Sequence, residues 1–281
     1  MAETFWLDGR WTDEAPLLIG PQDQAFWLAS VTFDGARAFH RCAPDLDLHC
    51  RRAVASARTL GLVPPITADE IQHLAEQGVR RFGLQAELYI KPVFYAAGPG
   101  HHVGSARTRF VLHLFEAPLP GPKGFSATLS PLRRPAPETA PTDAKAACLY
   151  PNSDRATREA KSRGFDEAVM LDPWGDVAEF AFANIMIAKE GRVRTPLANG
   201  TYLAGITRRR VLALLNEAGI EATEARLTPA DLDAADEIFS TGNYGKVVPC
   251  SRYETRDLNA GPIATKARQL YFDWAESTRI D

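Results

Sequence analysis

The sequence has few cysteines and lacks long apolar runs, and both absences limit what the protein can be. Four cysteines occur in 281 residues, and no two of them form a Cys-x-x-Cys pair. This pattern indicates free thiols in a reducing compartment rather than a disulfide framework. No apolar stretch approaches the roughly 18 residues that predict a membrane helix. The first residues also lack the pattern of a signal peptide, so we expect a cytoplasmic protein with no membrane partner.

The sequence also lacks an excess of either charge. It contains 32 lysines and arginines against 35 aspartates and glutamates, which gives a net charge of -3 and a pI of about 6.1. A nucleic-acid partner would need a basic surface, so none is expected. The GxGxxG nucleotide motif and the P-loop are both absent. His101 and His102 have no carboxylate or cysteine at ligand spacing nearby, so they indicate a mobile loop and no metal site.

Proline and glycine are concentrated in residues 117–142, which read APLPGPKGFSATLSPLRRPAPETAPT. Such a composition is typical of a linker that packs over the surface. We therefore expect three segments along the chain. They are a small amino-terminal α/β domain at residues 1–120, an interdomain linker at residues 121–142 and a larger carboxy-terminal domain at residues 143–281.

Turn and cap signals predict strands and helices in both halves of the chain. Asp8 and Gly9 lie between alternating aromatic residues, which predicts a β-hairpin. Thr67 and Glu70 form a capping box, which predicts a helix that begins after Thr67. Apolar spacing and β-branched runs predict further elements. We expect helices at 46–62, 153–162 and 262–277, a strand at 87–97, and hairpins at 167–180, 184–196 and 236–250.

Two more helices are expected in the second half. Thr207 is a good N-cap for a helix that Gly219 would end. Thr228 is a good cap for a short helix with Pro229 at its first position. Because hairpins replace regular βαβ alternation in both halves, the sequence predicts an α+β (mixed α/β) fold with antiparallel sheet.

Lys145 lies among small, mostly apolar residues in the segment PTDAKAACLY. One interpretation is that its stem packs against the protein while its ammonium group reaches water. The other is a lysine that forms a Schiff base, because burial lowers the pKa of lysine and favours the reactive amine. The usual aldehyde partner is pyridoxal phosphate. This cofactor also needs a phosphate cradle, a carboxylate for its ring nitrogen and a partner for its phenolic oxygen.

The sequence offers a candidate for each of these needs. The expected helix start at 205–207 would present N–H groups to a phosphate, although an ordinary capped helix has the same pattern. Glu179 lies in an apolar run, where it needs a partner such as a pyridinium nitrogen or an arginine. Tyr150, five residues after Lys145, would meet the phenolic oxygen or pack in the core.

In their order along the chain, these residues resemble the fold-type IV pyridoxal phosphate enzymes, the class that includes the branched-chain amino acid aminotransferases. The similarity covers most of the chain. It lies in the segments FDGARAF, LHCRRAVASARTLGL, YIKP, AKAACLY, GFDEAVMLDPWGDVAEFAFANI, YLAGITR, DEIFSTGNYGKVVP and GPIATKAR. The resemblance implies a two-domain architecture with a small amino-terminal domain and a larger carboxy-terminal domain, and it implies a homodimer.

The resemblance also implies roles around the cofactor, pyridoxal 5'-phosphate. Lys145 matches the lysine that binds the cofactor as a Schiff base and then carries the proton between Cα and C4′. Glu179 matches the glutamate at the pyridine nitrogen, and Tyr150 matches the tyrosine near the phenolic oxygen. The remaining matches are positions that contact the phosphate or the ring, namely Arg52, Leu203, Ile206, Thr207 and Asn243.

Three segments match positions that contact the substrate. The turn TGNYGK matches the one whose N–H groups receive the substrate α-carboxylate. The strand YIKP matches one that helps to bind the acceptor carboxylate, and FDGAR is similar to the branched-chain subgroup. The matching residues are Phe33, Gly35, Arg37, Tyr89, Lys91, Tyr244 and Gly245.

Some positions depart from the branched-chain pattern. Lys91 replaces an arginine, which keeps the charge but loses the bidentate fork. Phe180 and Phe182 stand where the family has small residues, and they are expected to add bulk near the site. Leu28 stands near the position of an expected tyrosine. These changes leave cofactor binding credible and leave the substrate open.

The resemblance implies a ping-pong transamination. In it, an apolar, branched-chain-like L-amino acid would pass its amino group to a 2-oxo acid such as 2-oxoglutarate. One alternative is a transaminase of the same fold that uses D-amino acids or (R)-amines. Another is a pyridoxal phosphate lyase of the aminodeoxychorismate type. A non-enzymatic binding protein is disfavoured because Lys145, Glu179 and the phosphate cradle occur together.

Overall fold

The protein divides into two compact units in a computed structural model that describes residues 2–121, 123–258 and 261–280. The amino-terminal unit contains the residues up to 118, together with 143–149 and those from 275 onward. The carboxy-terminal unit contains 119–142 and 150–274. Each unit mixes helices with a sheet, as the α+β prediction requires.

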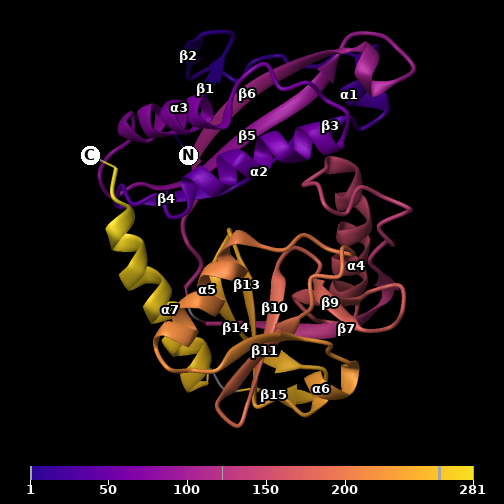
Figure 1. Cartoon of the computed structure of the whole chain (residues 1–281), viewed down its shortest axis with the longest axis vertical. Coiled ribbons are helices and arrows are strands. Elements are labelled where there is room, and N and C mark those ends of the chain that lie inside the picture. Colours follow the sequence, from indigo (N-terminus) through magenta and orange to yellow (C-terminus); the bar gives the residue numbers. More distant parts are fainter. Residues whose placement is uncertain (1, 122, 259–260, 281) are drawn as a thin grey trace. The chain divides into compact units, whose positions relative to one another are not determined.

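The amino-terminal unit is built on a six-stranded antiparallel sheet (Figure 1). Its order is β2, β1, β6, β5 and β3, and β4 also pairs with β5. The predicted hairpin is confirmed, because β1 and β2 pair around Asp8 and Gly9, whose φ angles of 49° and 85° suit a tight hairpin turn. The strands are Glu3–Leu7 (β1), Arg10–Thr12 (β2), Val31–Phe33 (β3), Ala36–Phe39 (β4), Glu87–Ala97 (β5) and Arg107–Glu116 (β6).

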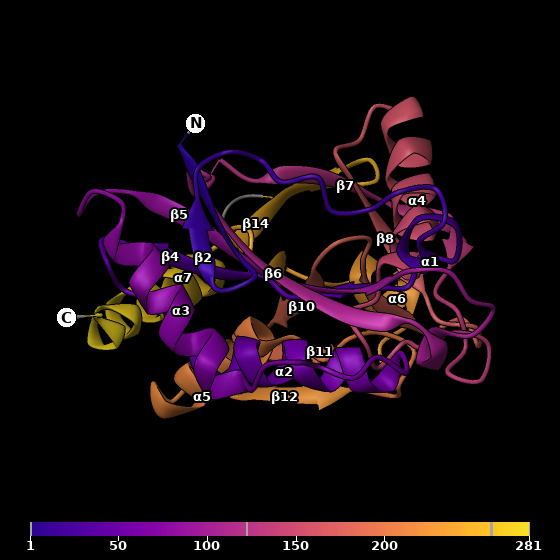
Figure 2. The same cartoon turned by 90° about the horizontal axis from the view of Figure 1, so that it is seen from above.

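Helices α2 (Leu46–Thr59) and α3 (Ala68–Arg80) cover one face of this sheet (Figure 2). Their apolar sides pack on alternate residues of β5 and β6, including Ile90 and Leu112. The predicted capping box at the start of α3 is present, with Thr67 and Glu70 bonded reciprocally. The unit also contains α1 (Gln24–Trp27) and the 3-10 turns η1 (Val103–Ser105), η2 (Ala147–Leu149) and η3 (Glu276–Thr278).

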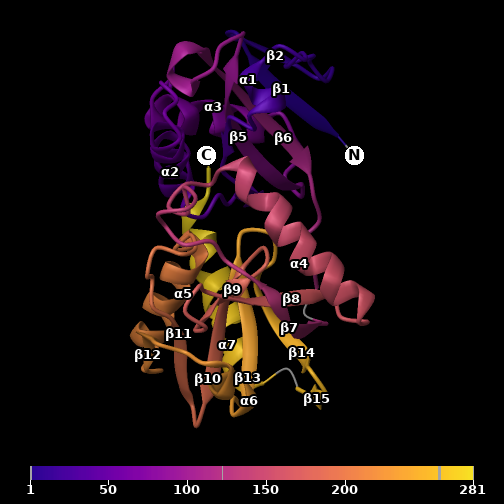
Figure 3. The ribbon, with the colours of Figure 1, turned by 90° about the vertical axis from the view of Figure 1, so that its right-hand side faces the viewer.

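The carboxy-terminal unit is built on a nine-stranded mixed sheet (Figure 3). Its order is β12, β11, β10, β13, β14, β7, β8 and β9, with β15 paired to β14. Parallel pairing occurs between β11 and β12, between β14 and β7, and between β7 and β8. The strands are Phe125–Arg133 (β7), Glu167–Leu171 (β8), Val177–Phe180 (β9), Asn184–Lys189 (β10), Arg192–Pro196 (β11), Ala222–Ala225 (β12), Glu237–Gly242 (β13), Lys246–Tyr253 (β14) and Arg256–Asp257 (β15).

Helices α4 (Tyr150–Ser162), α5 (Ile206–Glu217), α6 (Pro229–Asp233) and α7 (Pro262–Ala275) belong to the second half of the chain. The cap predicted at Thr228 is confirmed, because it forms a capping box with Asp231. The cap predicted at Thr207 is wrong, because Gly205 is the N-cap of α5 and Thr207 is its second helical residue. Among the residues that the structure describes, no helix is long and apolar enough to span a bilayer.

The segment predicted as a linker contains regular structure. Residues 125–133 form strand β7, which pairs in parallel with β14 on one side and β8 on the other. Its prolines and glycines lie mostly outside the strand, and the only one within it, Pro131, falls where the register with β8 shifts. The compact units also differ from the predicted domains because 143–149 and the residues from 275 onward belong to the amino-terminal unit.

Candidate active site

Lys145 is anchored through its backbone within the amino-terminal unit. Its N–H donates to Ser56 Oγ of α2 over 3.0 Å, and its carbonyl accepts the N–H of Phe33 over 3.1 Å. The next residue, Ala146, forms a β-bridge with Thr32. The Lys145 side chain is itself half-buried. The anchor therefore fixes the root of the side chain, and the four-carbon stem directs the amine.

Lys145 and Lys91 contact the same aromatic ring. Each Nζ lies 5.1 Å from the centroid of the Phe33 ring, which is within the range of a cation–π interaction. Burial lowers the pKa of Lys91, and the nearby charge of Lys145 lowers it further. Both effects favour the neutral form of Lys91.

Arg52 is held by a buried carboxylate. Its Nε and Nη2 donate to Asp34 over 2.6 and 2.9 Å, and His49 Nδ1 lies 2.7 Å from the same carboxylate. Burial alone would raise the pKa of Asp34, but the charge and hydrogen bonds of Arg52, with a further contribution from His49, hold that pKa well below its usual range. The guanidinium therefore has a fixed orientation, and its side chain is still 17% exposed. Such a group can face an anion.

Gly35, Arg37 and Tyr89 lie together where β4 pairs with β5. Arg37 is opposite Tyr89 in the strand register, and its Cζ lies 6.0 Å from the centroid of the tyrosine ring. A Cβ at Gly35 would lie 2.1 Å from the Tyr89 hydroxyl oxygen, so the close approach of the phenol requires glycine. The Tyr89 ring stacks on Phe115 with centroids 5.3 Å apart. The structure therefore brings together three of the residues that the resemblance assigns to the substrate.

Glu179 is buried within the carboxy-terminal unit, on β9. Its Oε1 lies 3.3 Å from Arg134 Nε, and its Oε2 accepts a hydrogen bond from Asn184 Nδ2 over 3.1 Å. Arg134 also donates to the carbonyl of Thr201 and to Ser153 Oγ, over 3.2 and 3.3 Å. Of the two partners that the sequence left open for this carboxylate, a pyridinium nitrogen or an arginine, the arginine is present. These contacts hold it in one orientation, as recognition of a ring N–H would require.

Asn184 joins Glu179 to the loop that precedes α5. Its Nδ2 donates to the carbonyl of Leu203 over 3.1 Å as well as to Glu179. A Cβ at Gly205, the N-cap of α5, would lie 2.0 Å from Asn184 Oδ1. Asn184 also stands opposite Thr241 in the register between β10 and β13. One amide side chain therefore contacts the buried carboxylate and fixes the start of the helix.

The first turn of α5 and the end of β13 carry buried polar groups. Ile206 and Thr207 are buried, and their N–H groups lie in the first turn of the helix. Thr241 Oγ1 and Asn243 Nδ2 are buried and have no hydrogen-bond partner among the described residues. Asn243 Oδ1 accepts a hydrogen bond from Lys246 Nζ over 2.8 Å. Buried donors without partners are costly unless a ligand meets them, and donors near a helix start suit an anion such as phosphate.

Tyr150, Tyr244 and Gly245 complete the predicted residues of the carboxy-terminal unit. Tyr150 is the first residue of α4, and its ring lies 5.9 Å from that of Phe182. Tyr244 is 64% exposed on the turn between β13 and β14. Gly245 is buried, and a Cβ there would lie 2.5 Å from Val248 Cγ2. The turn is therefore closely packed at Gly245, where a side chain would not fit.

The expectation that Phe180 adds bulk near the site is wrong. Its ring is fully buried in the hydrophobic core, where it packs edge-to-face against Phe125 with centroids 5.1 Å apart. Phe182, two residues later, is 51% exposed. Because successive strand residues point to opposite faces, Phe180 points away from the side on which Glu179 lies. Of this pair, only Phe182 is exposed, and its ring lies beside that of Tyr150.

Four residues of the candidate site were not predicted from the sequence. Asp34 holds Arg52, while Arg134 and Asn184 hold Glu179, and Thr241 carries a buried hydroxyl without a partner among the described residues. For Asp34 the signal was a lone acid between Phe33 and Gly35, where burial demands a counter-ion. Arg134 pairs with a carboxylate 45 positions away, so no local pattern marked it. Asn184 lies only five residues after Glu179, and Thr241 has no partner among the described residues, so nothing in the sequence singled out either.

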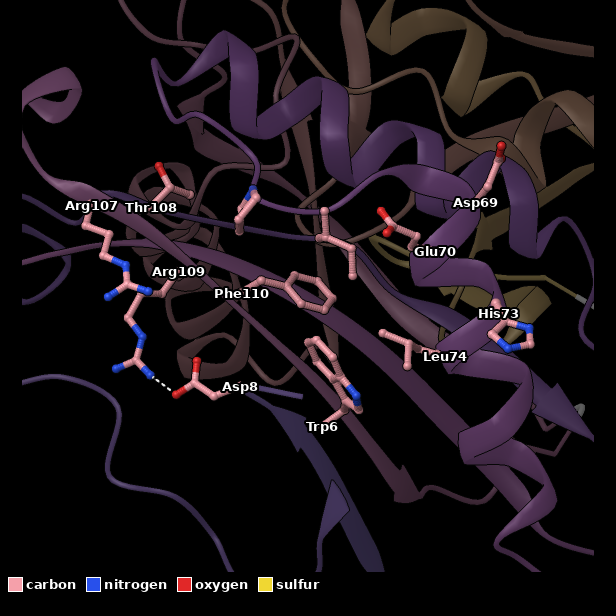
Figure 4. Close-up of a pocket in the computed structure, with 12 residues that line it drawn as sticks. Trp6, Asp8, Asp69, Glu70, His73, Leu74, Arg107, Thr108, Arg109 and Phe110 are labelled. Atoms are coloured by element: carbon pink, nitrogen blue, oxygen red, sulfur yellow. Dashed lines mark hydrogen bonds and ion pairs between the residues drawn. The ribbon is translucent and has the colours of Figure 1, made fainter. Parts of the chain in front are cut away.

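A separate cavity of about 740 Å³ lies in the amino-terminal unit, near the start of α3 and strands β1 and β6 (Figure 4). Trp6, Leu74 and Phe110 line it with apolar surface, and Arg107 and Arg109 lie at one end. None of the predicted site residues is among the described residues that line it. Trp6 and Phe110 point toward α3, so the cavity lies on the helix-covered side of the sheet.

The described residues include no cluster of three or more histidine, cysteine or acidic side chains that could hold a metal ion. His101 and His102 are exposed before the short turn η1. The candidate residues are of other kinds: lysines and an arginine in the amino-terminal unit, and a buried carboxylate with helix N–H groups in the carboxy-terminal unit.

Comparison with known proteins agrees with this chemistry. A family model described as amino-transferase class IV matches residues 32–253. A branched-chain-amino-acid aminotransferase of Pseudomonas aeruginosa is 33% identical over 288 residues, which cover 96% of this chain and 92% of the relative.

Solved structures give the same result. An aminotransferase from Brucella abortus, bound to the cofactor PLP, superposes with a TM-score of 0.95 at 44% identity, covering 98% of this chain and 100% of that one. A branched-chain aminotransferase from Thermoproteus uzoniensis with norvaline has a TM-score of 0.91 at 31% identity, covering 99% and 96%. The fold of this chain therefore agrees with that of each solved structure over nearly its whole length. The chain belongs to the class IV aminotransferases, with the fold-type IV architecture that its sequence resembles.

Proposed function

We propose that this aminotransferase uses pyridoxal 5'-phosphate to move an amino group from an apolar, branched-chain-like L-amino acid to a 2-oxo acid such as 2-oxoglutarate. The observation that carries the proposal is the network in the carboxy-terminal unit. There a buried carboxylate, Glu179, is tied through Asn184 to the start of α5, and buried donors nearby lack partners among the described residues. The donor set fits a ligand with a ring nitrogen and a phosphate.

The residues that would hold the cofactor have distinct tasks. Glu179 would accept the N–H of the pyridine ring, and the first turn of α5, with Thr241 and Asn243, would hold the phosphate. Arg52 would contribute a further cation, kept in place by Asp34. When bound, the cofactor withdraws electrons from the amino acid, which makes the Cα proton easier to remove.

Lys145 would remove and return that proton. Its amine is suited to the task because the backbone anchor fixes the side-chain root and Nζ lies 5.1 Å from the centroid of the Phe33 ring. Lys91 and Arg37, both on the sheet of the amino-terminal unit, would attract the carboxylate of an acceptor acid. The turn at Tyr244 and Gly245 would receive the α-carboxylate. A ping-pong order follows if the first product leaves before the second acid enters.

The names of two relatives support the substrate class. The Pseudomonas aeruginosa relative is named as a branched-chain enzyme, and the Thermoproteus uzoniensis structure contains norvaline, an apolar amino acid. A second candidate, a D-amino acid or (R)-amine transaminase, draws on the replacement of arginine by Lys91 and on the exposed Phe182 beside Tyr150. A lyase of the aminodeoxychorismate type is the third. We also propose a homodimer, which sedimentation of the purified protein would test.

A single-donor half-reaction tests the proposal. The cofactor-loaded protein would be mixed separately with L-leucine, L-glutamate, a D-amino acid and an (R)-amine, while the visible cofactor absorbance is followed. We expect L-leucine and L-glutamate to bleach it and to release their 2-oxo acids. Conversion by only the D-acid or the amine would favour the second candidate, and conversion by none of the donors would contradict transamination of these substrates.

The matched control is Lys145→Ala. We expect kcat to fall by a factor of about 1,000 or more, since a positioned base contributes roughly 100- to 10,000-fold. Cofactor binding should persist in part, because Glu179 and the phosphate contacts remain. Full activity in this variant would remove Lys145 from the catalytic role.

A further inference from the structure

His113 lies on the sheet face opposite the helices of the amino-terminal unit. On β6, Phe110, Leu112 and Leu114 pack in the core under α2 and α3, and Phe110 lines the cavity beside α3 (Figure 4). Side chains alternate along a strand, so His113 points to the other face. In the register, His113 stands directly opposite Lys91 of β5. The imidazole and the ammonium are therefore cross-strand neighbours on one face.

The imidazole of His113 contacts two aromatic rings and a carboxylate but remains partly exposed to solvent. Its ring stacks on Phe5 with centroids 4.2 Å apart and planes inclined by 13°, and it lies 4.6 Å from the Phe115 ring. Its Nε2 lies 2.9 Å from Glu3 Oε2, and its side chain is 24% exposed. The ring therefore has one orientation, and a partly exposed edge can meet a ligand.

The hydrogen bond to Glu3 defines how the ring gains a proton. An ionised carboxylate only accepts hydrogen bonds, so neutral His113 carries its hydrogen on Nε2 and leaves a lone pair on Nδ1. Protonation then adds an N–H at Nδ1 and a full positive charge. The groups that face the ring are Glu3 on β1 and Lys91 and Tyr89 on β5. Burial and Lys91 lower the pKa of His113, whereas Glu3 raises it, and the net direction is downward.

We propose that His113 is a specificity-determining residue, which in its protonated form joins Lys91 in binding the second carboxylate of a dicarboxylic 2-oxo acid. The inference rests on the proposed function, in which Lys91 attracts an acceptor carboxylate. Neutral His113 presents a lone pair, which repels an anion, so the site then depends on Lys91. Protonated His113 adds a second cation beside it. The preference for a dicarboxylic acceptor over a monocarboxylic one therefore rises as the pH falls.

Acceptor competition as a function of pH tests this assignment. With L-valine as the common donor, kcat/KM would be measured between pH 5.5 and 8 for 2-oxoglutarate and for 4-methyl-2-oxopentanoate. We expect the ratio of the two values to rise by about threefold toward pH 5.5, because one partly exposed charge contributes only modestly to binding an anion. Taking a ratio cancels pH effects on Lys145 and on the donor, which both acceptors share.

Three variants separate a charge effect from packing. His113→Phe keeps an aromatic ring between Phe5 and Phe115, and His113→Gln keeps a polar group, but neither can gain a proton. Both should give a ratio that does not change with pH. Glu3→Gln removes the carboxylate that favours the protonated ring, so the rise should move to lower pH. The matched control is His73→Gln on α3, an exposed histidine bonded to Gln77, which should leave the ratio as in the wild type.

The outcomes distinguish this inference from the proposed function. If the wild type transfers an amino group to neither acceptor, the proposed function fails and His113 loses its assigned role. If both acceptors react but their ratio is constant with pH, or if the pH dependence survives in His113→Phe and His113→Gln, only the inference is overturned. Thermal melting and cofactor absorbance of each variant would show that the fold is retained.

Discussion

The two units hold their chemically important residues by different means. In the amino-terminal unit, cations lie against aromatic rings on a partly exposed sheet face, as Lys91 and Lys145 do at Phe33. In the carboxy-terminal unit, Glu179 is buried and bonded to Arg134 and Asn184. Contacts of the first kind tolerate exchange of one cation for another. Contacts of the second kind do not, because each lost partner leaves a buried polar group unsatisfied.

This difference suggests that the carboxy-terminal unit mainly binds the cofactor and that the sheet face of the amino-terminal unit mainly binds substrates. A cofactor is the same molecule in every turnover, so a rigid and fully bonded network suits it. Substrates differ in length and charge, so a sheet face whose side chains can change suits them. The departures from the branched-chain pattern follow this division in part, since Lys91 lies on the sheet face whereas Glu179 matches the family.

Asp34 belongs to the amino-terminal unit, but it is buried and bonded in the way that Glu179 is in the other unit. Its substitution should therefore have the largest effect on stability. Asp34→Asn removes the buried carboxylate that pairs with Arg52 and contacts His49. Removing one partner of a buried pair costs about 3 kcal/mol. We expect that loss in urea unfolding at pH 7, with faster hydrogen exchange in α2. The control is Asp47→Asn, which removes an exposed pair with Arg51 and should change stability by less than about 0.5 kcal/mol.

The same variant has a predicted pH signature. The pKa of Asp34 is depressed in the folded protein, so its stabilisation is complete above the unfolded value of about 3.9 and is lost as the pH falls further, toward the folded value. The difference in unfolding free energy between wild type and Asp34→Asn should therefore be largest near pH 7 and shrink below about pH 4. A difference that grows in acid would contradict the ion pair.

Gly205→Ala tests the rigidity of the carboxy-terminal unit. The new Cβ would lie 2.0 Å from Asn184 Oδ1, so either the loop or the amide must move. Because Asn184 also bonds Glu179 and Leu203, we expect cofactor affinity to fall about tenfold, or about 1.4 kcal/mol. Equilibrium dialysis against pyridoxal 5'-phosphate would measure it. Gly83→Ala, where a Cβ meets nothing within 4 Å, is the control, and an equal loss there would refute the explanation.

Much of the local structure could be predicted from the sequence. The hairpin at Asp8 and Gly9 and the capping boxes at Thr67 and Thr228 depend on neighbouring residues, and all three are present. Strand β7 was missed because the prolines and glycines that flank it are typical of a linker, while its pairing partners, β14 and β8, come later in the chain. Parallel pairing leaves no turn signal in the sequence.

The candidate site shows the same limit. Lys145 and Glu179 were singled out by their apolar surroundings and Arg52 by the family resemblance, and the roles assigned to all three remain predictions. The residues that orient them were missed, because Asp34 lies 18 positions from Arg52 and Arg134 lies 45 from Glu179. A sequence shows that a buried charge needs a counter-ion but does not show which one the fold supplies.

The smallest expected effect comes from Lys91→Arg, which exchanges one cation for another on the sheet face of the amino-terminal unit. An arginine restores a bidentate fork for a carboxylate, so we expect the KM for 2-oxoglutarate to fall about threefold while cofactor affinity is unchanged. Steady-state kinetics and equilibrium dialysis would measure the two quantities. An unchanged acceptor profile would mean that Lys91 has only a structural role. A parallel loss of cofactor affinity would mean that substrate binding and cofactor binding are not separated between the two units. Because the larger guanidinium must share the Phe33 ring with Lys145, a lower kcat with the lower KM would show that acceptor binding and proton transfer compete for the same aromatic surface.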